Sequence, residues 1–166
     1  MKNISKLTGF SLLNLIVLIV FSFIFITPIA AEESLYERGK ELVEQKDYEK
    51  ALTAFDLAAK AGNLDALTAL GVMYIGGIGV EQNNEKGFQY IKRAADKADP
   101  KAQYTLGALY YLGVGVEKDY KKAFNWLNLS SEQNYIDAKY NLGVMYEFGE
   151  GVDQSYEKAY EYYLFA

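Results

Sequence analysis

The stretch Leu-Gly-Val-Met-Tyr at residues 70–74 recurs as Leu-Gly-Ala-Leu-Tyr at residues 106–110 and again as Leu-Gly-Val-Met-Tyr at residues 142–146. The copies are 36 residues apart, and each is followed at the same offset by Gly-x-Gly-Val. A repeat of this length is typical of stacked supersecondary units, which bury their apolar faces only against their neighbours. The spacing therefore predicts a linear array of similar units.

The repeated phrase is predicted to lie on the first of two helices in each unit. Its leucine, glycine and tyrosine fall on one helical face. A glycine inside a helix costs about 1 kcal/mol relative to alanine, so its recurrence indicates that another helix packs too closely for a Cβ atom. We interpret six residues of the phrase as structural: Gly71, Tyr74, Gly107, Tyr110, Gly143 and Tyr146.

A second helix is predicted after each Gly-x-Gly turn, whose glycines can adopt positive φ and end the first helix. A residue of a preferred N-cap type follows in every unit, namely Asp47, Asn83, Asp119 and Ser155. No segment shows the alternation of apolar and polar residues that predicts a strand. We therefore predict an all-α fold of antiparallel helix pairs, with units at about residues 33–66, 67–102, 103–138 and 139–166.

Residues 1–31 have the features of a secretory signal. Lys2 and Lys6 precede an apolar stretch over residues 10–26, and small residues follow the helix breaker Pro28. We predict cleavage after Ala31, which leaves residues 32–166 as an exported repeat domain, either periplasmic or secreted. The alternative is that the apolar stretch is retained as a membrane anchor.

Composition narrows the classes of function. Loss of Lys2 and Lys6 with the signal changes the net charge from -5 to -7, which suits neither nucleic acid nor an anionic membrane surface. The chain has no Cys and no His, which excludes disulfides, thiolate metal sites and the Ser-His-Asp and zinc-protease arrangements. Its carboxylates are interspersed with lysines, as on solvated helix faces. We predict no cofactor, no metal and no catalytic residue.

The pattern resembles the Sel-one-like repeat, a longer relative of the tetratricopeptide repeat. It combines Leu-Gly-x-x-Tyr, Gly-x-Gly-Val, a capping residue, Lys-Ala and an aromatic residue, over residues 65–166. The first unit departs from it, because Gly39 precedes Gly71 by only 32 residues and the Gly-x-Gly-Val insertion is missing. The resemblance implies a right-handed α-solenoid whose concave face, lined by the first helices, binds peptides or proteins. It implies no catalytic residues.

Extending the tetratricopeptide register onto this chain places residues that differ between units on the concave face. The candidate partner-binding residues are Tyr104, Tyr111, Tyr140, Asn141 and Glu147. Exposed tyrosine supplies a large contact area at a small entropic cost. The alternative interpretation is ordinary packing between repeats. We predict a non-enzymatic protein-interaction scaffold of the bacterial envelope or exterior, with a protein or peptide as its partner.

Two other functions stay open at this stage. Disulfide-stapled secreted relatives of the repeat family have been linked to β-lactam binding or hydrolysis, so a β-lactam-active or cell-wall enzyme is one alternative, although this chain lacks their cysteine pairs. A membrane-anchored assembly factor is the other. The last second helix leaves five residues without a following repeat, namely Tyr160, Tyr162, Tyr163, Leu164 and Phe165. This predicts burial in a partner, self-association through the C-terminal helix, or a shortened array.

Overall fold

The computed structural model describes residues 33–166, and each regular element in that range is an α-helix. A helix over residues 33–44, called the N-terminal helix below, is followed by α2 (Tyr48–Ala61), α3 (Leu64–Gly76), α4 (Asn84–Ala95), α5 (Pro100–Leu112), α6 (Tyr120–Glu132), α7 (Ile136–Phe148) and α8 (Tyr156–Leu164). None of these helices is both long and apolar enough to cross a membrane. The predicted signal over residues 1–31 lies outside the described part of the chain.

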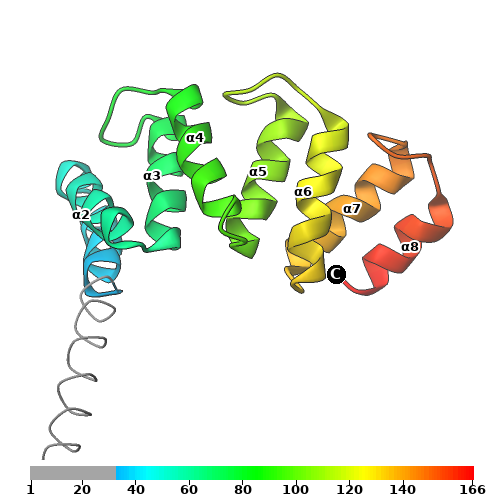
Figure 1. Cartoon of the computed structure of the whole chain (residues 1–166), viewed down its shortest axis with the longest axis horizontal. Coiled ribbons are helices and arrows are strands. Elements are labelled where there is room, and N and C mark those ends of the chain that lie inside the picture. The colour runs from blue at the N-terminus through cyan, green and yellow to red at the C-terminus, as the bar shows by residue number, and fades with distance from the viewer. Residues whose placement is uncertain (1–32) are drawn as a thin grey trace, which may run out of the picture.

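The helices stand in one curved row, and consecutive helices run in opposite directions (Figure 1). Packing is most extensive within the pairs α3–α4, α5–α6 and α7–α8, and each pair also packs against the next. This arrangement confirms the predicted all-α solenoid. The three pairs begin at Leu64, Pro100 and Ile136, three residues before the unit starts at 67, 103 and 139.

The second helix of each unit begins directly after the residue that was predicted to be its N-cap. The side chains of Asp47, Asn83, Asp119 and Ser155 accept hydrogen bonds from the backbone N–H groups three residues further on. Each such cap contributes about 1 kcal/mol, because it satisfies a donor that the helix itself leaves unpaired. The four caps thus fix where α2, α4, α6 and α8 start.

The glycine of the repeated phrase lies under a large side chain of the second helix. A Cβ atom at Gly107 would be 2.8 Å from Cγ of Leu127, and one at Gly143 would be 2.6 Å from Cε1 of Tyr163. Gly39 and Gly71 stand in the same relation to Phe55 and Ile91. A close approach of the kind expected at this glycine is present, and the neighbour is the eighth residue of each second helix.

The second glycine of each turn joins neighbouring units. Gly151 has φ 76°, and a Cβ atom on it would lie 2.5 Å from the carbonyl oxygen of Tyr120 at the start of α6. Gly115 packs in the same way against Asn84 at the start of α4, and Gly79 against Tyr48 at the start of α2. Each turn therefore rests on the second helix of the unit before it. From the sequence, these glycines were expected only to end the first helix and turn the chain.

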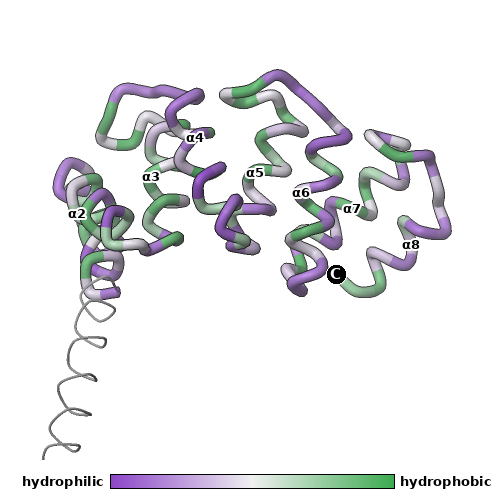
Figure 2. Tube along the Cα trace, in the orientation of Figure 1, coloured by the Kyte–Doolittle hydropathy of each residue, from purple (hydrophilic) through white to green (hydrophobic). Residues whose placement is uncertain are grey.

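Buried side chains form two hydrophobic clusters along the row. Leu42, Phe55 and Leu70 belong to the N-terminal cluster, and Ile91, Leu106, Leu127 and Leu142 belong to the larger cluster that follows. Figure 2 shows apolar and polar residues mixed along every labelled helix, as expected for helices that bury one side and expose the other. The surface that remains on the first helices positions the candidate site.

Candidate functional site

Two cavities open on the face formed by the N-terminal helix and by α3, α5 and α7, which we call the first-helix face. The N-terminal pocket, of about 350 Å³, lies between the N-terminal helix and α3. The C-terminal pocket, of about 300 Å³, lies between α5 and α7. Each pocket therefore occupies the groove between the first helices of two successive units.

The C-terminal pocket brings together three of the five candidate residues. Its walls include Tyr104, Ala108, Tyr111 and Leu112 of α5 and Asn141 and Val144 of α7. Leu127 of α6 and Met145 of α7 form the buried base. The result is an apolar recess whose polar groups are two phenol hydroxyls and one amide.

The tyrosines of this pocket are held by aromatic neighbours. The Tyr104 ring lies 5.2 Å from the ring of Tyr135, at an angle of 35°. The Tyr111 ring meets that of Tyr120 edge-on, with centroids 5.1 Å apart. Aromatic pairs in such tilted or edge-on geometries are favourable beyond the area that they bury. The two rings are therefore oriented before any partner arrives.

The Tyr111 hydroxyl is also fixed, because it donates a hydrogen bond of 2.5 Å to Oε2 of Glu150. The pKa of Tyr111 is raised to about 12, mainly by this hydrogen bond and to a smaller extent by burial. The phenol therefore stays protonated at physiological pH. The side-chain amide of Asn141 differs, since within residues 33–166 it makes no side-chain hydrogen bond and remains able to pair with a ligand.

The other two candidate residues contact α8. The Tyr140 ring is 5.4 Å from the Tyr163 ring, although 55% of Tyr140 remains exposed. The Tyr163 hydroxyl donates a hydrogen bond of 2.6 Å to Oε2 of Glu147. The pKa of Tyr163 is raised to about 12, mainly by burial and to a smaller extent by this hydrogen bond. Tyr140 and Glu147 thus contact α8 and do not line the C-terminal pocket.

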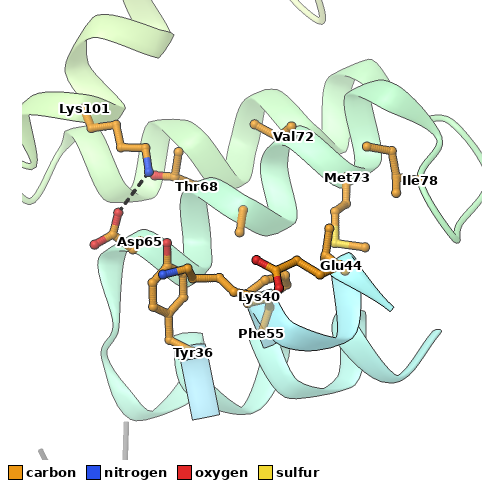
Figure 3. A pocket seen from close by; sticks show the side chains of 12 residues that line it. Tyr36, Lys40, Glu44, Phe55, Asp65, Thr68, Val72, Met73, Ile78 and Lys101 are labelled. Atoms are coloured by element: carbon orange, nitrogen blue, oxygen red, sulfur yellow. Dashed lines mark hydrogen bonds and ion pairs between the residues drawn. The ribbon is translucent and has the colours of Figure 1, made fainter. Parts of the chain in front are cut away.

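The N-terminal pocket was missed by the sequence argument. Lys40 and Glu44 come from the N-terminal helix, and Thr68 and Val72 face them from α3 (Figure 3). At one end, Nζ of Lys101 in α5 lies 3.3 Å from Oδ1 of Asp65 in α3. Burial alone would lower the pKa of Lys101, but the negative charge of Asp65 raises it above its usual value.

The available sequence signal for this pocket is the shortened first unit. A shift of 32 residues, in place of 36, aligns Gly39 with Gly71. One further repeat of 36 residues then brings Tyr36 into register with Tyr104. Tyr36 does line the N-terminal pocket, as Tyr104 lines the C-terminal one. The first unit therefore contributes to the first-helix face despite its different turn.

The repeat pattern and the fold together identify the family. The Sel1 repeat model matches residues 30–63, 64–99, 100–135 and 136–166. The chain belongs to the Sel1 repeat family, the Sel-one-like repeats that its sequence resembles. Proteins of this family are generally non-enzymatic scaffolds for protein–protein interaction.

Two solved structures are similar to this chain. One is a protective antigen of uropathogenic Escherichia coli strains that displays an SLR fold, with 30% identity and a TM-score of 0.73 over 81% of this chain and 30% of that protein. The other is a Sel1 repeat protein from Oxalobacter formigenes, with 33% identity and a TM-score of 0.74 over 79% of this chain and 54% of that protein. The chain thus spans less than two thirds of either.

Proposed function

We propose that this Sel1 repeat protein binds a segment of a partner protein on the concave side of the array, through the first-helix face. The observation that carries the proposal is that Tyr104, Tyr111 and Asn141 line one cavity of about 300 Å³ between α5 and α7. The tetratricopeptide register placed them on the concave face, and they differ between units. Their shared cavity supports a role for that variation in recognising a ligand.

The chemistry of the cavity suits a peptide better than a small polar metabolite. Leu112 at its edge is 61% exposed, and Ala108 and Val144 add further apolar surface. Covering apolar surface supplies binding free energy, and well-packed tyrosines are frequent hot spots of interfaces. The free amide of Asn141 can both donate to and accept from a peptide backbone.

A second contact is proposed at α8, with another copy of the chain. Tyr160 on this helix is 63% exposed, and Phe165, the C-cap residue that follows the helix, is 71% exposed. At the position of Tyr160, α4 and α6 carry Phe88 and Phe124, whose rings pack edge-on against Tyr110 and Tyr146 of the following first helix. The surface of α8 is thus of the kind that the array elsewhere covers with a helix.

The proposal extends to the place of action. The basic and apolar build of residues 1–31 supports export, after which the repeat domain acts in the envelope or outside the cell without catalysis. Mass spectrometry of the native protein tests this part. A mature N-terminus at Glu32 supports export with cleavage, whereas an intact N-terminus on a membrane-bound form supports the anchored alternative.

Affinity capture from the native envelope tests the binding site. The full chain is the bait, Tyr104→Ala is the test variant, and Leu129→Ala, an exposed apolar residue of α6, is the control. We expect Tyr104→Ala to reduce capture of the main eluting protein about fivefold or more, as truncation of an interface aromatic does. Equal capture by both variants would place the binding site elsewhere.

A further inference from the structure

The two pockets of the first-helix face are equivalent sites two units apart. Met73 and Met145 occupy the same position of the repeat, and so do Phe55 and Leu127, the large residues that face the helix glycines. Val72 and Val144 correspond on one wall. The array therefore presents the same recess twice along one groove.

The rims of the two pockets differ in charge. Lys40 and Glu44 edge the N-terminal pocket, whereas Ala108 and Leu112 hold the corresponding positions of the C-terminal pocket. Lys40 is hydrogen-bonded to Glu37 at 3.0 Å. Lys101 is paired with Asp65, but within residues 33–166 Glu44 has no ion-pair partner. The unbalanced charge at the N-terminal pocket is therefore negative.

We propose that both pockets are occupied by one extended peptide, which carries a lysine or arginine in the N-terminal pocket and an apolar side chain in the C-terminal pocket, about five residues or more apart. This inference rests on the proposed function of the first-helix face. A lysine or arginine fits the first position because its apolar stem can lie along Val72 and Phe55 while its cationic end reaches Glu44. The C-terminal recess has no charged lining residue to match a second ion.

The separation has a lower bound from the geometry of packed helices. Within residues 33–166, α4 packs against both α3 and α5, so successive first helices are at least as far apart as directly packed helices, roughly 8–10 Å. The two pockets are two units apart, so their centres are separated by at least roughly 16 Å. An extended chain covers about 3.3 Å per residue, which requires about five residues or more between the two side chains.

Peptide selection tests the spacing directly. A phage-displayed library of random peptides, twelve residues long, is selected on the full chain, which is kept in mild detergent because of its apolar stretch at residues 10–26. We expect the enriched peptides to carry a basic and an apolar residue about five or more positions apart. A gap of three, or enrichment of a single apolar residue with no basic partner, would overturn the inference.

Two variants assign the pockets, with one fluorescein-labelled selected peptide as the probe. Glu44→Lys should weaken binding about tenfold and abolish the preference for the basic residue. Ala108→Phe, which fills the C-terminal pocket, should weaken binding about tenfold and abolish the preference for the apolar residue. Glu161→Lys, the same charge reversal on the exposed surface of α8, is the matched control and should bind like the parent.

The outcomes separate this inference from the function on which it rests. If only Ala108→Phe affects binding, the face binds peptides but the two-site inference is wrong. If neither variant affects binding and both melt like the parent protein, the inference and the concave-face proposal fail together. A failure to select any peptide also counts against both.

Discussion

The Tyr163 hydroxyl of α8 donates a hydrogen bond to the carboxylate of Glu147 in α7, a residue that was predicted from the sequence to bind a partner. The distance of 2.6 Å is that of a hydrogen bond to a charged acceptor. Glu147 therefore helps to attach the last helix to the array. A partner that approaches Glu147 meets a carboxylate that already has one donor.

Replacement of Tyr163 by Phe removes this hydrogen bond and keeps the ring. We expect Tyr163→Phe to lower the free energy of unfolding by about 2 kcal/mol, because a hydrogen bond to a charged acceptor is lost. Tyr162→Phe, on the same helix, is the control, since within residues 33–166 its hydroxyl makes no side-chain hydrogen bond. Urea denaturation measures both. Equal losses would show that the Tyr163–Glu147 hydrogen bond has no special role.

Stability should also fall at alkaline pH. The pKa values of Tyr111 and Tyr163 are raised from about 10 to about 12, because each phenol is hydrogen-bonded to a carboxylate and partly buried. A raised folded-state pKa means that the stabilisation is complete below about pH 10 and is lost as the pH rises through 12. Urea midpoints between pH 9 and 12, with tyrosinate absorbance recorded in parallel, test this.

The double variant Tyr111→Phe/Tyr163→Phe is the control for that measurement. It should lose less stability between pH 9 and 12 than the parent does, because it lacks the two phenols with raised pKa. The loss that remains reports other groups, such as Lys122, whose pKa is raised by its hydrogen bond to Asp119. A double variant with the same alkaline loss as the parent would contradict the assignment.

Gly107 should be among the residues least tolerant of substitution. Gly107→Leu forces a side chain against Leu127 and the backbone of α6, so we expect a loss of about 3 kcal/mol or more in unfolding free energy. Gly76→Leu is the matched control, because Gly76 is exposed and a Cβ atom there would meet only the flexible side chain of Ile78. Thermal melting of both variants decides whether the close approach matters.

Two tyrosines should separate stability from binding. Tyr110 is buried and packs edge-on against Phe88, so Tyr110→Ala should lower the unfolding free energy by about 2–5 kcal/mol. Tyr140 is mostly exposed, so Tyr140→Ala should weaken partner binding by about 1 kcal/mol. Its melting temperature should fall much less than that of Tyr110→Ala. Melting curves and capture yields are measured on the same preparations. The binding role of Tyr140 would be refuted by full capture.

Self-association through α8 predicts a dependence on concentration. The charged substitution Phe165→Asp should shift the sedimentation profile toward monomer, because an aspartate cannot be buried cheaply in an apolar contact. Leu57→Asp, at the corresponding position of α2, is the control at an exposed apolar residue. A parent protein that stays monomeric at high concentration would contradict this part of the proposal.

The parts of the fold that were predictable are those with a local cause. Caps such as Asp119 depend on residues three positions away, and the Gly107 constraint is visible because the same glycine recurs. The contact of Gly151 with Tyr120 was not predictable, since a glycine in a turn already has a sufficient local explanation. The position of its carbonyl neighbour is set by the stacking of units.

For the candidate site, the face on which residues lie could be predicted, but the hydrogen bonds between helices and turns could not. The tetratricopeptide register, taken over from the family resemblance, placed Tyr104, Tyr111 and Asn141 on one face, and all three line the C-terminal pocket. The hydrogen bonds from Tyr111 to Glu150 and from Tyr163 to Glu147 were not foreseen. They link a helix to a turn or to another helix, and their lengths depend on how the units pack.

The contact of each turn with the unit before it gives the array a direction. The turn at Gly79 rests on α2, the turn at Gly115 on α4 and the turn at Gly151 on α6, so support always runs from the N-terminal side. During synthesis the N-terminal units emerge first. Each turn that leaves the ribosome can then pack against a helix that was synthesised before it. This contact of the turn does not depend on any segment that is synthesised later.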